Sequence, residues 1–205
     1  MPRPRFEKLP PEKRELILET AAKEFAEFGY EGASLNQILA KAGISKGAAY
    51  YYFDNKEDLY GTAVSHYAIE MIDKLDLDFQ DLTAVSFWPA LQTMYEQQYT
   101  QFAERPWVFG VVKSGGPMNQ ALLMQGELGE FWQNLEGMLA NLLRQGAELG
   151  VVRHDLPDDL MMAVVMAVDE AHDNWLLSHL PEMTNEELQA AAAQMVGLLQ
   201  KLLAP

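Results

Sequence analysis

The stretch from Ser45 to Tyr52 combines hydroxyl groups, one ammonium group and very small side chains. Hydroxyl and ammonium groups donate hydrogen bonds to phosphate oxygens, and small side chains let a backbone approach another molecule closely. On a helical wheel at about 100° per residue, Ala49 and Phe53 share one side. The opposite arc carries Gly47, Ala48 and Tyr51, with Lys46 and Tyr50 on one edge and Ser45 and Tyr52 on the other.

This arrangement predicts a helix that enters the major groove of DNA, which is about 12 Å wide. Small residues at the centre of the face admit the backbone, and the flanking phenols donate to phosphates. The alternative is an ordinary core cluster, which we accept for Phe53. For Tyr50 we expect a ring that is half core with its hydroxyl outward.

Further candidates flank this helix. Lys56 stands at the positive end of the next helix, and a proline-spaced basic arm precedes the first helix. The expected DNA-binding residues are Arg3, Arg5, Ser34, Ser45, Lys46, Gly47, Ala48, Tyr50, Tyr51, Tyr52 and Lys56.

The elements that must position these residues are helices. A first helix opens at Pro10-Pro11 and ends at Gly29. Ser34 with Gln37 forms a capping box for a second helix, and Gly43 supplies its left-handed C-cap. The short connection to Ser45 predicts a helix-turn-helix over about residues 34–53. Asn55 caps a fourth helix over 56–75.

The rest of the chain also predicts helices. We expect them at 83–104, 107–112, 119–149, 157–180 and 186–203, the last opened by a Thr184/Glu187 capping box. No strand alternation is present in the sequence. The predicted fold is all-α, with a DNA-binding domain at 1–56 and a larger effector-binding and dimerisation domain at 57–205.

Charge divides the chain in the same way. The 205 residues are 49% hydrophobic and carry a net charge of -15. Residues 1–56 hold nine Lys/Arg and eight Asp/Glu, or +1, whereas residues 57–205 hold six and twenty-two, or -16. Cysteine is absent, which excludes thiolate chemistry, and no run reaches the ~18 apolar residues of a membrane span. We expect a cytoplasmic protein without a cofactor.

The segment "ASLNQILAKAGISKGAAYYYFDNKEDL" resembles the DNA-binding domain of TetR/AcrR-family transcriptional regulators. The pattern K-G-x-x-Y-x-x-F-x-x-K-x-x-L is matched by Lys46, Gly47, Tyr50, Phe53, Lys56 and Leu59. The resemblance implies a repressor that binds a palindromic operator as a homodimer through its last two helices and is released by a small molecule. Leu39 and Ala49 depart from the family's usual sizes, which suggests a volume swap across the turn.

The second half is rich in methionine and tryptophan, which suits a pocket for an apolar or aromatic effector, although an ordinary core explains each residue taken singly. The family resemblance is what favours such a cavity for the group as a whole. The expected ligand-binding residues are Trp88, Tyr95, Phe102, Trp107, Met124, Trp132, Met162, Met166, Asp169 and Trp175.

The cluster Asp169, His172 and Asp173 interrupts an otherwise apolar helix. Three interpretations stay open: a solvated rim of the bundle, a polar patch that recognises the ligand, and a metal site, which one helix rarely completes. Two other function classes compete. A helical enzyme using the Asp169/His172 pair lacks an accompanying nucleophile or phosphate loop, and an effector-independent DNA-binding protein would show no ligand-induced release.

Overall fold

The computed structural model describes residues 2–75, 79–114 and 126–205, and the side chains of 126–128 and 131 are not part of that description. These residues form helices and no strand, which confirms the all-α prediction. Their contacts separate two compact units, one within Met1–Ile72 and Trp107–Phe131 and one within Asp73–Pro106 and Trp132–Pro205. No helix in the described ranges is long and apolar enough to cross a membrane.

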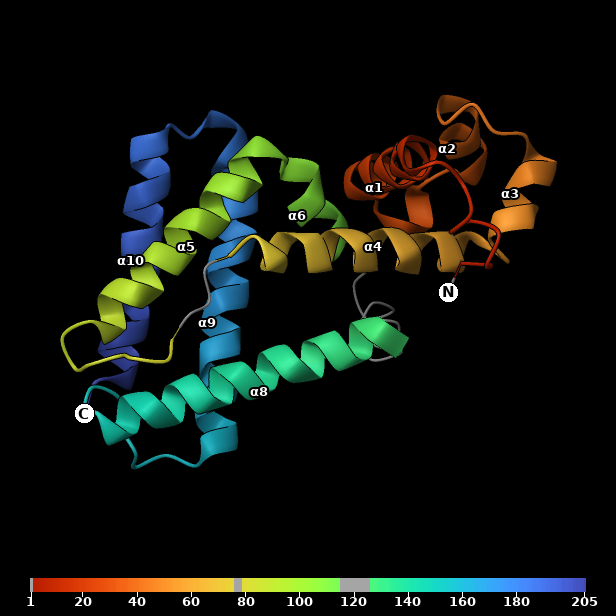
Figure 1. Ribbon diagram of the computed structural model, residues 1–205. Coiled ribbons are helices and arrows are strands. Elements are labelled where there is room, and N and C mark those ends of the chain that lie inside the picture. The colour runs from red at the N-terminus through yellow and green to blue at the C-terminus, as the bar shows by residue number, and fades with distance from the viewer. Residues whose placement is uncertain (1, 76–78, 115–125) are drawn as a thin grey trace. The chain divides into compact units, whose positions relative to one another are not determined.

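The first unit contains α1 (Pro11–Gly32), α2 (Leu35–Lys41), α3 (Lys46–Tyr52), α4 (Lys56–Asp73) and α6 (Pro106–Lys113). Figure 1 shows α2 and α3 following α1 near the N-terminus. Gly29 (φ 68°) breaks the helical backbone inside α1, where the sequence predicts its end. Gly43 follows α2 with a left-handed backbone (φ 62°), a conformation in which any other residue would be strained.

Glu24 joins α1 to the helix-turn-helix from the interior. Its buried carboxylate accepts hydrogen bonds from the Ser34 backbone N–H (3.2 Å) and from the Lys41 ammonium (2.8 Å). The Lys13 ammonium donates to the carbonyl of Ala42 at 2.7 Å, beside the turn. Both ends of α2 are therefore held by side chains of α1.

The first unit continues past residue 56, because α4 has a buried aromatic face in it. The division into a DNA-binding domain at 1–56 and an effector-binding domain at 57–205 stays a prediction. The ring of Tyr60 lies 4.9 Å from that of Phe25 in α1. Tyr67 donates to a Glu15 carboxylate oxygen at 2.7 Å and lies 4.8 Å from the ring of Trp107. These contacts join α4 and α6 to the DNA-binding helices.

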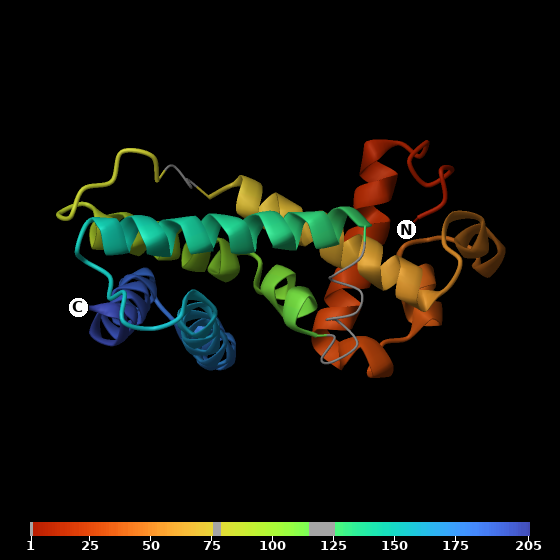
Figure 2. The same ribbon diagram turned by 90° about the horizontal axis from the view of Figure 1, so that it is seen from below.

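The second unit contains α5 (Phe87–Glu104), α9 (Asp158–His179), the short helix η1 (Leu180–Glu182), α10 (Asn185–Leu203) and the larger part of α8 (Gly126–Glu148). Helix α10 packs against both α5 and α9, and Figure 2 shows α9 and α10 side by side. Thr184 and Glu187 form the predicted capping box. Residues 119–125 of the predicted helix 119–149 lie outside the described residues.

Helix α5 begins later than predicted. Thr83 and Ser86 satisfy each other's backbone N–H groups with their hydroxyls, at 2.9 and 3.2 Å. Such local hydrogen bonds compete with the helical ones, so the chain turns at 83–86 and the helix starts at Phe87.

We predict that Leu39→Ala destabilises the first unit by about 2–5 kcal/mol, because this side chain is 4% exposed and its loss leaves a cavity. Denaturant unfolding measures the change. Asn36→Ala on the exposed side of α2 is the control and should change stability by less than ~0.5 kcal/mol. Adding Ala49→Leu should recover part of the loss. A neutral Leu39→Ala variant contradicts the proposed volume swap.

A second prediction concerns the buried His172. Burial lowers its pKa below the usual value near 6.5. The unfolded chain therefore takes up the proton first as the pH falls, so this residue removes stability below about pH 6.5 and not above it. His172→Gln should make the loss of stability between pH 7.5 and 5.5 shallower. His154 lies in an exposed loop, so His154→Gln should keep the wild-type dependence of the unfolding free energy on pH. If that free energy falls equally steeply with pH in all three proteins, the prediction is refuted.

Candidate functional site

Helix α3 is held by its caps and by one apolar side. The Ser45 hydroxyl accepts a hydrogen bond from the Ala48 N–H at 3.2 Å, and the Phe53 N–H donates to the carbonyl of Ala49 at 2.8 Å. Ala49 and Phe53 are buried, as the helical wheel predicts. A seven-residue helix is marginal by itself, so this buried side and these caps keep it in place.

The opposite side of α3 is open. Ser45, Lys46 and Gly47 are exposed, and Ala48 and Tyr52 are partly exposed. Tyr50 and Tyr51 are each 47% exposed. The structure thus brings together on one surface the residues that the sequence assigns to DNA, with the small ones between the phenols.

Gly47 has no role in the packing of the fold. A Cβ at this position meets no atom closer than the Ser45 hydroxyl oxygen, 4.0 Å away, and the backbone does not need a glycine there. Glycine within a helix reduces stability by up to about 1 kcal/mol relative to alanine. The absence of a side chain at Gly47 therefore fits a requirement set by a molecule outside the chain.

Arg5 extends this surface. Its guanidinium lies 4.1 Å from the ring centroid of Tyr51, a distance typical of a cation–π contact. Both residues are exposed. A planar cation on an exposed phenol can contact a phosphate or a base edge.

Two other predicted contacts are engaged inside the first unit. Arg3 pairs with Asp54, and the Lys56 ammonium donates to the Glu31 carbonyl at 3.2 Å and lies 4.8 Å from the Tyr30 ring. Each would have to leave its partner to reach a phosphate. The phosphate contacts of Arg3 and Lys56 therefore stay predictions. The open surface itself consists of Arg5, Ser45, Lys46, Gly47, Ala48, Tyr50, Tyr51 and Tyr52.

Ser34 serves the scaffold as well. Its hydroxyl accepts a hydrogen bond from the Gln37 N–H at 3.4 Å, so it caps α2. The reciprocal half of the predicted capping box is not formed, because the Ser34 N–H donates to Glu24 instead. The side chain is partly exposed, which leaves the hydroxyl hydrogen available to another acceptor.

The predicted ligand-binding residues do not form one group. Tyr95 and Phe102 are buried, whereas Trp88, Trp132, Met162 and Asp169 are partly exposed. Met166 and Trp175 are 47% and 40% exposed on α9, which does not fit the lining of a closed cavity. Trp107 belongs to the first unit, with the Lys23 ammonium 5.3 Å from its ring. Met124 lies outside the described residues.

The cluster on α9 faces α5 and not the solvent. Tyr95 donates to Asp169 at 2.9 Å, and the Tyr99 hydroxyl lies 2.9 Å from Nδ1 of His172. The rings of Tyr99 and His172 are also stacked. His172 and Asp173 are buried, so the solvated-rim interpretation is wrong for these two residues. Burial raises the pKa of both tyrosines, with the aspartates adding to the effect, so the phenols stay protonated as donors.

The described part of the chain shows no group of three histidine or acidic side chains close enough to hold a metal ion. The polar network of Tyr95, Asp169, Tyr99 and His172 instead connects α5 to α9. Buried polar groups that are paired in this way favour one arrangement of the helices over others.

A groove that the sequence analysis missed lies in the second unit, with a volume of about 590 Å³. It runs between residues 79–80 and one face of α8, and five of its lining residues are amides: Gln80, Gln133, Asn134, Asn141 and Gln145. Gly137, Met138 and Leu142 add an apolar strip. The signal was present in the sequence as uncharged polar residues at helical spacing, but nothing there places Phe79 and Gln80 opposite them.

Comparison with known proteins supports the interpretation of α2 and α3. Residues 17–63 match the family described as "Bacterial regulatory proteins, tetR family". The chain is similar to the uncharacterized HTH-type transcriptional regulator YhgD of Bacillus subtilis, with 35% identity over 65 residues. That match covers 32% of this chain and 34% of YhgD.

Solved structures show the same fold over nearly the whole chain. The fatty acid degradation regulator FadR of Bacillus halodurans superposes with a TM-score of 0.73 at 21% identity, covering 94% of this chain and 96% of its own. FadR of Bacillus subtilis, solved in complex with stearoyl-CoA, gives 0.70 at 18% identity, covering 90% and 96%. With the motif on α3, the family match shows that residues 17–63 form the DNA-binding domain of a TetR-family transcriptional regulator.

Proposed function

We propose that this regulator is a repressor that inserts α3 into the major groove of an operator. The observation that carries the proposal is the outer face of α3, where a glycine without a packing role lies between two exposed phenols and beside two exposed cations, Lys46 and Arg5. The glycine lets the backbone of α3 approach the base edges, and the phenols and cations donate hydrogen bonds to phosphates.

The proposed active form is a homodimer through α9 and α10. One recognition helix reads only a few base pairs, whereas a two-fold dimer reads two half-sites about 34 Å apart. Large apolar side chains are exposed on both helices: Leu160, Met166, Trp175, Leu198 and Leu202. Exposed apolar residues gathered on two adjacent helices favour a protein interface, so we reassign Met166 and Trp175 to it.

The effector is proposed to bind in the second unit, with the groove on α8 as its accessible entrance. The Bacillus subtilis FadR structure holds stearoyl-CoA. A ligand with several negative charges is disfavoured here, because residues 57–205 carry six basic and twenty-two acidic side chains. The amides and the strip of Met138 and Leu142 suit a neutral or cationic aromatic compound better.

Release is proposed as a population shift. The effector-bound dimer favours a conformer in which the two recognition helices no longer match the spacing of the half-sites. Operator DNA must then weaken effector binding by the same factor, because binding free energies are coupled reciprocally. The comparisons point to a regulator family and not to an enzyme class, and the His172 pair of the enzyme alternative is buried against Tyr99.

The decisive experiment selects bound duplexes from a random pool and then measures Gly47→Ala. We predict that this variant is up to about 1 kcal/mol more stable than the wild type, because alanine is the better helix former and meets no clash. It should bind the selected operator at least about tenfold more weakly, since a methyl group then stands between the backbone and the bases.

Gly137→Ala on α8 is the matched control, because its Cβ also enters open space. It should gain similar stability and keep operator affinity. If Gly47→Ala binds as well as Gly137→Ala, α3 does not approach DNA by this face, and a pool without any enriched duplex contradicts DNA recognition altogether.

Filling the groove should separate effector response from DNA binding. We predict that Gly137→Phe retains operator affinity but loses release by any compound that releases the wild type in a screen of neutral and cationic aromatics, with stearoyl-CoA as the anionic comparison. Operator fluorescence anisotropy measures both properties. Full release of Gly137→Phe places the effector elsewhere, and a screen without hits favours the effector-independent alternative.

A further inference from the structure

The N-terminal arm, residues 2–9, is docked on the end of the recognition helix. Phe6 is 2% exposed, and its ring lies 4.8 Å from that of Phe53 and 6.3 Å from that of Tyr52. The backbone N–H of Arg3 donates to the carbonyl of Tyr52 at 2.8 Å. This arm is therefore part of the domain and not a free extension.

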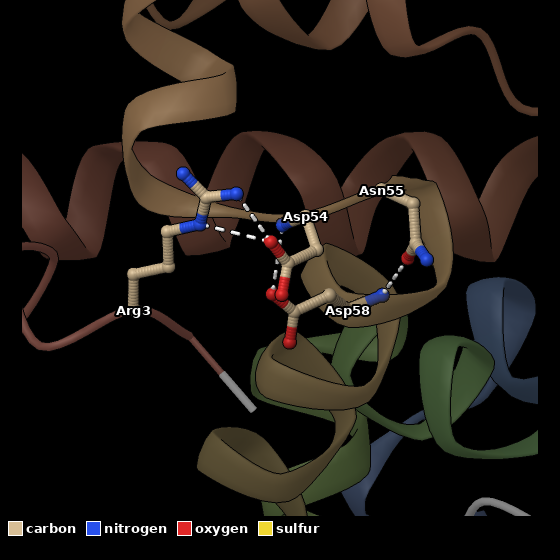
Figure 3. A network of polar contacts seen from close by, with 4 residues as sticks. All are labelled: Arg3, Asp54, Asn55 and Asp58. Carbon is tan, nitrogen blue, oxygen red and sulfur yellow. Dashed lines mark hydrogen bonds and ion pairs between the residues drawn. The ribbon is translucent and has the colours of Figure 1, made fainter.

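Arg3 continues the contact into the corner between α3 and α4, as Figure 3 shows. Its Nε donates to Oδ1 of Asp54 at 2.9 Å, and Nη2 binds the same oxygen. The Asp54 N–H donates to Oδ2 of Asp58 at 3.1 Å, and the Asp58 N–H donates to Oδ1 of Asn55 at 2.8 Å. One chain of hydrogen bonds thus runs from the arm to the start of α4.

The two arginines of the arm differ in their surroundings. The charge of Arg3 is matched by a carboxylate, whereas Arg5 lies over Tyr51 and makes no ion pair with any residue that the structure describes. A phosphate contact by Arg3 would compete with Asp54, and a phosphate contact by Arg5 would not. Of these two arginines, only Arg5 is therefore expected to release counterions on DNA binding.

We propose that Arg3 is a positioning residue, which with Phe6 and Asp54 sets the direction of α3 relative to α4 and leaves the phosphate contact to Arg5. The inference rests on the proposed DNA-binding function. Exposed ion pairs contribute little to global stability, so the role of this pair lies in the orientation of the helix. A small rotation of α3 misplaces every group on its outer face at once.

Removing Asp54's charge gives the sharpest test. Asp54→Asn deletes a negative charge beside the DNA face, so electrostatics alone predicts tighter binding at low salt. Positioning predicts weaker binding, by about fivefold, because the clamp on α3 is lost and base contacts are misplaced. The affinity of the full-length protein for its selected operator is measured by anisotropy at several salt concentrations.

The salt dependence distinguishes the two arginines. Arg3→Gln should weaken binding about fivefold at every salt concentration with an unchanged slope of log affinity against log salt. Arg5→Gln should reduce the magnitude of that slope by about one. The double variant Arg3→Asp/Asp54→Arg should recover much of the affinity, because it re-forms the ion pair with the charges reversed.

Circular dichroism and thermal melting establish that each variant is folded at the temperature of the binding assay, so a loss of affinity reports orientation and not unfolding. A reduced slope for Arg3→Gln together with tighter binding by Asp54→Asn assigns Arg3 to a phosphate and overturns the proposal. Unchanged affinity in both variants also overturns it. Wild-type protein without operator preference instead refutes the proposed function on which the inference rests.

Discussion

The burial of Ala49 and Phe53 is the interaction on which the DNA-binding surface depends. Seven residues are too few for a helix to persist in water, so α3 exists because one side is packed and both ends are capped. The same packing leaves the opposite side of the helix, with Gly47 and Tyr51, exposed to solvent. That exposure allows a glycine, an alanine and three tyrosines to be placed for contact with another molecule.

Support for this short helix comes from segments far away in the sequence. Glu24 and Lys13 of α1 hold the ends of α2, and the aromatic face of α4 packs on α1 and α6. These links join residues between ten and fifty-two positions apart in the sequence. In the proposed mechanism an effector acts through such links. A change in the direction of α4 also reorients α3, because the two helices are joined by a short turn.

Local patterns predicted the helices and the face of α3 because caps, turn glycines and wheel positions depend on near neighbours. Gly43, Asn55 and the Thr184/Glu187 box all lie where the sequence indicates. The sequence does not indicate that Arg3 and Lys56 have partners in the fold, because Asp54 and the carbonyl of Glu31 are distant from them in sequence. The residues predicted to bind the ligand lie in different parts of the structure for the same reason. Composition indicates a methionine-rich interior, but it does not indicate which helices pack against each other.

The most direct measurement of the central claim is a structure of the dimer bound to its selected duplex. The account predicts α3 in the major groove, with the backbone at Gly47 and Ala48 nearest the base edges and the Tyr50 and Tyr51 hydroxyls at phosphates. A complex in which the outer face of α3 remains in solvent, or in which another surface carries the DNA, would contradict it.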